Sequence, residues 1–319
     1  MPSPAMRGVK RAVLRMPRRK LAGVEAATVA HRKTMDRVLD RSTIEPLKLG
    51  VRAEGEALRK ILAAGIGSSS RPATKGDLAI VRRYLDRSLL RTGHQARAHL
   101  LDSTKDTQVE AARSLAKFAH SLSPKTGTSL DDEAMLSRLV NKHRKALEAG
   151  RRTSSAALTQ NIRMAARDQV SALSLEGMTA ADLVKKAHEI ASDQWWQVER
   201  TVRTENSVAF NTTQHTAMQE LAKDIPGLMM RWTELISDIT GAPFDDRVGK
   251  DSMVLHGQVA RPGQLFVMPP HPLAPSKMVG KKWAHPPNRP NDRAVLTPWA
   301  PGKGVVAWQW VGERRVTLK

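Results

Sequence analysis

The chain has 319 residues, with 52 Lys and Arg against 31 Asp and Glu, a formal net charge of +21 at pH 7. It has no cysteine, which excludes disulfides, thiolate metal sites and cysteine nucleophiles, and its hydrophobic fraction of 40% is enough for a folded core. A positive excess of this size favours a polyanionic partner, and nucleic acid is the leading one.

Residues 1–23 read as a basic, flexible arm. No apolar run of signal-peptide or membrane-spanning length follows it, so we expect neither that route of secretion nor a membrane span. Its cations suit an arm that lies on phosphates or on an acidic protein surface, and a solvated tail is the alternative. They are Arg7, Lys10, Arg11, Arg15, Arg18, Arg19 and Lys20.

Residues 24–224 read as a succession of helices, because apolar residues return every three or four positions and prolines are few. Val81, Leu85 and Leu89 share one face of an amphipathic helix that we expect to begin at Thr74 or Asp77 and to end at Gly93. Loops are predicted at 65–76 and 123–133, where Gly, Ser and Pro are dense.

A further helix start is predicted at Thr179, because Asp182 follows three residues later as in a capping box. The stretch from there to residue 223 reads as two helices that meet near Trp195 and Trp196.

The composition changes after residue 224: twelve of the 18 prolines and five of the seven tryptophans lie in 225–319. We expect a separate, small, mixed module, rich in strands and loops, with strands within 228–236, 264–268, 304–312 and 315–319. The predicted fold class is therefore α+β, with a mainly helical N-terminal two-thirds.

One polar cluster invites a catalytic interpretation. Arg203 and Glu205, with His215 or Asp238, could act as acid, base or substrate clamp. However, the sequence offers no activated nucleophile, Gly-rich phosphate loop or P-loop lysine. We favour a structural interpretation, in which Arg203 and Glu205 form ion pairs or cap neighbouring backbone groups.

Metal binding is the next alternative, since Asp238, His256, His271 and His285 are adequate zinc ligands. Nothing in their spacing demands a metal, and His271 and His285 each precede a proline, which favours extended chain. We expect no metal and no other cofactor.

The tryptophans and two lysines raise the question of contacts with nucleic acid. Tryptophans can stack on single-stranded bases, but with one Tyr and four Phe in the chain we expect them to supply the large-ring packing of the core. Lys281 and Lys282, in a proline-stiffened loop, are candidates for a phosphate or partner contact, with a solvated loop as the alternative.

Several short motifs follow one another along residues 198–298. "RTVRTENSVAFNTTQ" is followed by "RWTELISD", by the pair "HG", by "MPPHPLAPSK" and by "PPNRPNDRAV". This order resembles that of the Mu F-like minor head proteins of tailed bacteriophages. Cysteines that many relatives carry are missing from "DITGAPF" and "NDRAV". The residues that match the family pattern are Arg203, Thr204, Glu205, Asn211, Trp232, Asp238, His256, Gly257, Pro290, Asn291 and Arg293.

The resemblance implies a structural protein of the virion, not an enzyme, located in the head interior near the portal and in the host cytoplasm during assembly. Its implied partners are the portal or major capsid protein and double-stranded DNA, bound without sequence specificity and without a membrane. An ADP-ribosyltransferase-like, nucleotide-using enzyme centred on Arg203 and Glu205 is one alternative. A general nucleoid-type DNA-binding protein is another.

Overall fold

The computed structural model describes residues 30–31, 33–35, 37–38, 44–67, 69–122, 133–234, 250–287, 294–301, 307–311 and 314–318. The predicted basic arm, residues 123–132 of the loop predicted at 123–133, and four of the family-pattern residues fall outside this part of the chain. Those four are Asp238, Pro290, Asn291 and Arg293.

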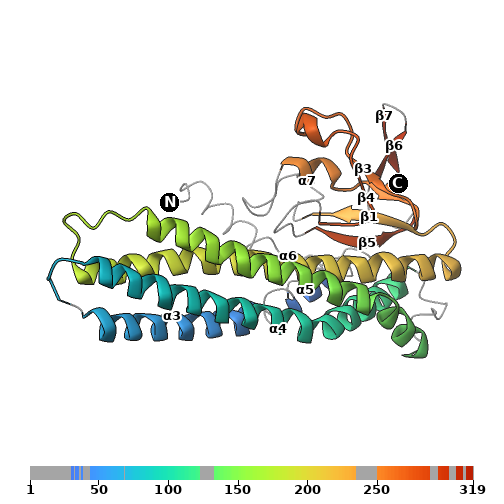
Figure 1. The fold of residues 1–319 in the computed structure, drawn as a ribbon. Helices are drawn as coiled ribbons and strands as arrows, with labels where there is room; N and C mark the ends of the chain where they lie inside the picture. The colour runs from blue at the N-terminus through green and yellow to red at the C-terminus, as the bar shows by residue number, and fades with distance from the viewer. Residues whose placement is uncertain are drawn as a thin grey trace, which may run out of the picture. The chain divides into compact units, whose positions relative to one another are not determined.

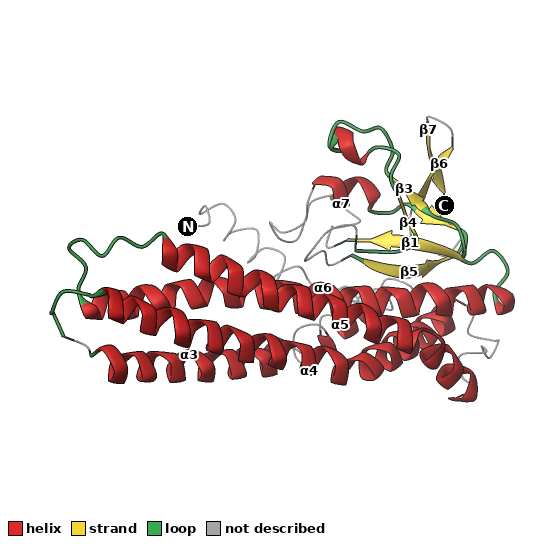
Figure 2. Ribbon diagram, viewed as in Figure 1, coloured by secondary structure: helices red, strands yellow, loops and turns green. Residues whose placement is uncertain are grey.

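Four long helices lie in the described part of the helical region (Figure 1). They confirm the mainly helical N-terminal prediction, and the strands follow them (Figure 2). The helices are α3 (Glu45–Ile66), α4 (Lys75–Leu122), α5 (Glu133–Ser171) and α6 (Ala180–Asp224).

The helix starts predicted at Thr74 and at Thr179 both carry a capping box. The backbone N–H of Asp77 donates to Thr74 Oγ1 at 3.2 Å, and Asp77 Oδ2 accepts from the Thr74 N–H at 2.9 Å. Thr179 and Asp182 form the same pair of bonds at the start of α6. These bonds satisfy backbone donors that the first helical turn leaves without partners, so both starts are encoded locally.

Two helix predictions were wrong. The helix predicted to end at Gly93 continues to Leu122. Gly93 instead faces α5, so closely that a Cβ atom there would lie 2.2 Å from Thr159 Oγ1. Here glycine permits close helix packing and does not end the helix. The predicted division near Trp195 and Trp196 is also absent, since α6 is continuous from Ala180 to Asp224.

The chain packs as two compact units, and each long helix from α4 to α6 contributes to both. We call residues 36–109 and 140–210 the helical unit, and residues 1–35, 110–139 and 211–319 the mixed unit. The sequence boundaries at 23 and 224 mark changes of composition, whereas packing groups the residues after 224 with the ends of three helices.

The helical unit is a four-helix bundle. The face predicted from Val81, Leu85 and Leu89 is buried in its core with leucines of α3 and α6. Each helix touches two neighbours in an up-and-down arrangement. The contacts are Glu54–Arg91 between α3 and α4, Gly93–Thr159 between α4 and α5, Arg151–Asn206 between α5 and α6, and Gly55–Trp195 between α3 and α6.

The mixed unit contains short antiparallel strands, which confirm all four predicted strand segments. Three strands form one sheet, in the order β2 (Val259–Ala260), β1 (Met229–Thr233), β5 (Val295–Trp299). Two ribbons accompany it, β3 (Phe266–Val267) with β4 (Lys282–Trp283), and β6 (Ala307–Val311) with β7 (Arg314–Leu318). Short helices occupy Lys250–Leu255 (α7) and Ser276–Met278 (η3).

The core of the mixed unit joins helices to the sheet. Phe118 of α4 and Met218 of α6 are buried in one cluster with Met230 and Trp232 of β1 and Leu296 of β5. Three helix ends therefore cover apolar side chains that so small a sheet could not bury by itself. None of the described helices combines the length and the apolar character that a bilayer crossing requires.

Candidate functional site

The Arg203-Thr204-Glu205 element lies on α6 in the helical unit. Arg203 is 8% exposed and donates to Glu199 Oε1 at 2.9 Å, and Thr204 Oγ1 donates to the Arg200 carbonyl at 2.8 Å. Residues two apart on a helix point in different directions, so Arg203 and Glu205 do not face a common substrate. The ion pair expected of Arg203 is present, one helical turn before it.

A buried arginine, Arg151 of α5, explains why Glu205 and Asn206 matter to the bundle. Its guanidinium donates to the Leu100 carbonyl and to Thr104 Oγ1 (2.8 Å) on α4, and to Asn206 Oδ1 (2.8 Å) and the Glu205 carbonyl (3.3 Å) on α6. Burial lowers its pKa to about 10, while the charges of Glu205 and Glu148 act in the opposite direction. Arg151 therefore stays charged at neutral pH and ties three helices together.

Sequence reasoning missed Arg151 among many basic residues, although a signal existed. Ser155, Leu158, Ile162 and Ala166 follow it at helical spacing and are all buried. A cation at the first position of a core-facing stripe must find several acceptors.

Asn211, also on α6 but in the mixed unit, anchors strand β5. Its Nδ2 donates to the Ala294 carbonyl at 3.1 Å, and its Oδ1 accepts from the Leu296 N–H at 3.0 Å. The buried side-chain amide thus pairs with β5 as a peptide group of a neighbouring strand would. Both ends of the amide serve the fold, so this family-pattern residue has a structural role.

The His256-Gly257 pair makes a turn against two tryptophans. Gly257 has φ of +80°, and a Cβ atom there would lie 3.0 Å from Trp308 Nε1. Trp308 Nε1 donates to the His256 carbonyl at 2.7 Å, and the Gly257 N–H donates to the carbonyl of fully buried Trp232 at 2.8 Å. Both the conformation and the close approach require glycine.

Burial of the tryptophans is confirmed for Trp232, Trp299 and Trp308. It is wrong for Trp196, which is 58% exposed with the Arg200 guanidinium 5.4 Å from its ring centroid. The Trp195 ring faces α3, where it would meet a Cβ atom placed on Gly55. Successive residues of a helix point in different directions, so Trp196 points outward.

The histidines proposed as catalytic or metal-binding residues make other contacts. His285 donates through Nδ1 to the Pro286 carbonyl at 2.6 Å and accepts through Nε2 from Thr212 Oγ1 at 3.1 Å, and burial lowers its pKa. The His215 ring lies 5.9 Å from that of His285, and His271 is exposed. Over the residues that the structure describes, no group of three or more His, Asp or Glu could hold a metal ion.

Of the cations predicted to contact phosphates, Lys281 and Lys282 lie in the described part of the chain. Lys281 and Lys282 are exposed where β4 pairs with β3, and the Lys281 carbonyl accepts from the Met268 N–H at 3.0 Å. Both ammonium groups are thus accessible on a paired ribbon. The seven arm cations lie outside the described residues.

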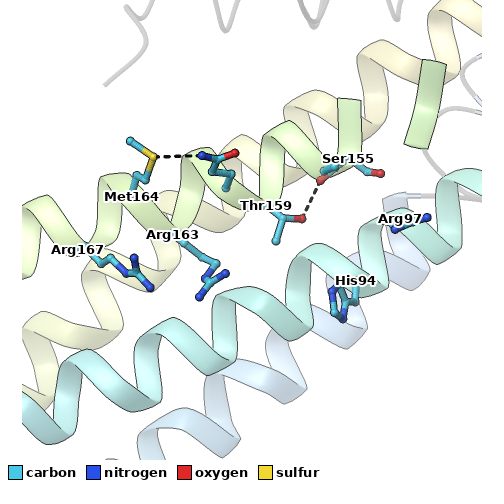
Figure 3. A pocket seen from close by; sticks show the side chains of 9 residues that line it. His94, Arg97, Ser155, Thr159, Arg163, Met164 and Arg167 are labelled. Carbon is cyan, nitrogen blue, oxygen red and sulfur yellow. Dashed lines mark hydrogen bonds between the residues drawn. The ribbon is translucent and has the colours of Figure 1, made fainter. Parts of the chain in front are cut away.

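A groove of about 550 Å³ lies between α4 and α5 in the helical unit (Figure 3). Arg163 makes two bonds to Asp86 of α4, at 2.9 and 2.6 Å, and Arg167 Nη2 lies 2.9 Å from Asp86 Oδ1. The Arg163 hydrogen bonds are the main reason that the pKa of Asp86 is lowered. The lining residues are His94 and Arg97 of α4, and Ser155, Ala156, Thr159, Gln160, Arg163, Met164 and Arg167 of α5.

Sequence reasoning did not find this groove, because its two sides are about sixty residues apart in the chain. The available signal was the helical spacing of Arg163 and Arg167 on one side and of His94 and Arg97 on the other. Only the antiparallel packing of α4 and α5 brings the two pairs together.

Comparisons of the chain with protein-family models, with curated proteins and with solved structures found no match.

Proposed function

We propose that this chain is a structural protein of a phage head, similar to the Mu F-like minor head proteins. In this proposal it associates with the portal or major capsid protein in the head interior and contacts packaged double-stranded DNA without reading its sequence. The order of motifs from Arg203 to Arg293 supports the family, and the fold of a helical region followed by a small strand-rich part accommodates it.

The bidentate contact of Asn211 with β5 is the observation that carries the proposal. A family-pattern residue that served catalysis would keep a polar group available to a substrate, whereas both ends of this buried amide bond to backbone atoms. The close approach of Gly257 to Trp308 is structural in the same sense. The family-pattern residues are therefore better explained by a role in stabilising the fold than by a role in catalysis.

The charge of the chain supports the DNA contact. A net charge of +21 gives a protein beside densely packed DNA the cations it needs to neutralise phosphates. Contacts to phosphates carry no sequence information, so Lys and Arg on accessible surfaces suffice. Lys281 and Lys282 are such residues in the described chain, and the basic arm at 1–23 is the second candidate.

Mass spectrometry of purified heads, before and after nuclease and high-salt treatment, tests the proposal. We expect a low copy number per head, with the protein retained when the DNA is removed, because docking on a protein ring is the anchor. Absence from the heads would contradict the proposal. Abundant coating of host DNA without head association would instead support the nucleoid-type alternative.

A second test separates the structural role from the enzymatic alternative. Glu205→Gln removes a charge beside Arg151 and should weaken folding or head incorporation, with no turnover to lose. Glu176→Gln, on an exposed turn residue, is the matched control. An intact fold in Glu205→Gln, with loss of a nucleotide-dependent activity that the wild type possesses, would favour the enzyme.

A further inference from the structure

Positive charge in the helical unit is concentrated on two of its four helices. Within this unit α4 (75–109) and α5 (140–171) together carry fourteen Lys or Arg and six Asp or Glu. By contrast, α3 (45–66) and the α6 portion (180–210) together carry eight of each sign. A charge selected only for solubility would not need such a partition, so the α4–α5 side of the bundle is the electrostatically distinct one.

The excess lies along the rims of the groove. On α4 the residues at 83, 87, 94, 97 and 105 are spaced so that they share one stripe, and all five are exposed. On α5 those at 142, 145, 152, 163 and 167 share a stripe that passes through the groove residues Ala156 and Gln160. The two stripes are Arg83, Arg87, His94, Arg97 and Lys105, and Lys142, Lys145, Arg152, Arg163 and Arg167.

The guanidinium groups that line the groove differ in whether an acidic residue holds them. Asp86 holds Arg163 and Arg167 in place through the bonds described above, yet its single charge cannot neutralise both. Arg97 is exposed and makes no ion pair in the described part of the chain. The groove therefore keeps a net positive charge and presents donors with a defined orientation.

We propose that this groove and its two basic stripes are the surface on which the sugar-phosphate backbone of double-stranded DNA lies. The inference rests on the proposed function for the identity of the polyanion. It adds a site formed by α4 and α5, distinct from the arm and from Lys281 and Lys282.

Length and chemistry favour DNA over an acidic protein surface. From Arg83 to Lys105 a helix rises about 33 Å at about 1.5 Å per residue, which is close to one turn of B-DNA. Protein interfaces usually centre on apolar or aromatic anchors with few charges, and Met164 is the one large apolar side chain that lines the groove. Rows of Arg and Lys side chains suit evenly spaced phosphates, which accept bidentate hydrogen bonds from the guanidinium groups among them.

The test measures binding of the full chain to a random-sequence 30-base-pair duplex by fluorescence anisotropy over a range of salt concentrations. Arg87→Glu/Arg97→Glu changes two exposed α4 residues, and Arg59→Glu/Lys60→Glu makes the same change of charge on exposed residues of α3. We expect the α4 variant to lose at least about tenfold in affinity and the α3 variant less than about threefold. Arg97→Ala should lower the salt slope by about one.

Asp86→Asn tests the site in the opposite direction. It removes the only groove-side acid that binds Arg163 and Arg167 in the described residues, so we expect tighter DNA binding at neutral pH. Circular dichroism establishes that each variant remains helical before its affinity is compared.

Several outcomes would overturn the inference. Equal losses in the α4 and α3 variants would show that net charge alone matters, and full affinity in the α4 variant with loss on removal of residues 1–23 would place the DNA contact on the arm. Binding of purified portal protein, instead of DNA, through Arg87 and Arg97 would also contradict it. Absence of the wild-type chain from heads would refute the proposed function while leaving a DNA-binding groove intact.

Discussion

The helical unit and the mixed unit provide hydrogen-bond partners for their buried backbone groups in different ways. Helices hydrogen-bond their own backbone, so the side chains of the helical unit can be divided between an apolar core and a charged surface. The mixed unit contains strands of only two residues, β2, β3 and β4, whose ladders are too short to do the same. Side chains supply part of the backbone pairing of this unit, both at the two-residue strand β3 and at the longer strand β5.

Buried amides make the difference concrete. In the mixed unit Asn211 bonds to the Ala294 carbonyl and to the Leu296 N–H where β5 begins, and the Gln258 side chain accepts from the Val267 N–H and donates to its carbonyl, each at 3.0 Å. In the helical unit Gln194 is fully buried, and neither amide atom has a protein partner within the described residues. The amide of Gln194 is thus a cost to the helical unit, whereas those of Asn211 and Gln258 support the mixed unit.

Replacing the anchoring amide should have the largest effect. Asn211→Ala leaves the Ala294 carbonyl and the Leu296 N–H without this partner, and we expect a loss of about 3 kcal/mol in the free energy of unfolding. Hydrogen exchange should be fastest to respond at the Leu296 amide. Asn161→Ala, on an exposed position of α5, is the control and should change stability by less than about 0.5 kcal/mol. Equal effects of the two substitutions would remove the contrast between the units.

Gly93→Ala tests whether close packing of α4 on α5 sustains the helical unit. Alanine favours a helix over glycine by about 1 kcal/mol, but its Cβ would meet Thr159, whose β-branched side chain cannot easily turn away. We expect the clash to prevail, with a net loss of about 1–2 kcal/mol in urea unfolding.

Two further variants test whether the clash with Thr159 causes the expected loss. Gly150→Ala, where nothing lies within 4 Å of the new Cβ, should stabilise the protein by about 0.5–1 kcal/mol. Thr159→Ala removes the two closest atoms, so Gly93→Ala should cost less in that background. Stabilisation by Gly93→Ala alone would mean that the helices tolerate a wider spacing.

Gln194→Leu sharpens the comparison of buried amides. An apolar side chain of similar size should stabilise the helical unit by about 1 kcal/mol, because it removes a buried polar group that has no protein partner. The same substitution at Gln258 should destabilise the mixed unit, because it leaves Val267 without its two bonds. Thermal unfolding measures both changes, and a loss of stability in Gln194→Leu would contradict the assignment.

The smallest expected effect is the pH dependence of the Asp86 ion pair. Its arginine partners hold the pKa of Asp86 below the usual value of about 3.9, so the stabilisation is fully present above that pH and is lost as the pH falls through the folded-state pKa. The difference in stability between the wild type and Asp86→Asn should therefore be constant near neutral pH and shrink below about pH 4. Asp168→Asn, an exposed residue of α5, is the charge-matched control. If the difference in stability between the wild type and Asp86→Asn grew as the pH fell, it would contradict a lowered pKa of Asp86.

Local features of the sequence predicted much of the fold. The two helix starts, the amphipathic face of α4 and the four strand segments depend on neighbours within a few residues, and each is present. Gly93 and the Trp195-Trp196 pair misled because their local chemistry is ambiguous. Glycine ends a helix or admits a neighbouring one, and only the position of α5 distinguishes the two.

By itself the sequence determined the composition of each segment, the starts of α4 and α6, four of the seven described strands and the excess of positive charge, since these follow from short-range hydrogen bonding and periodicity. Tertiary structure alone decided that Arg151 is buried, that Asn211 completes β5, and that the two basic stripes border one groove. Each of these depends on residues far apart in the chain, and only packing sets how close such residues come.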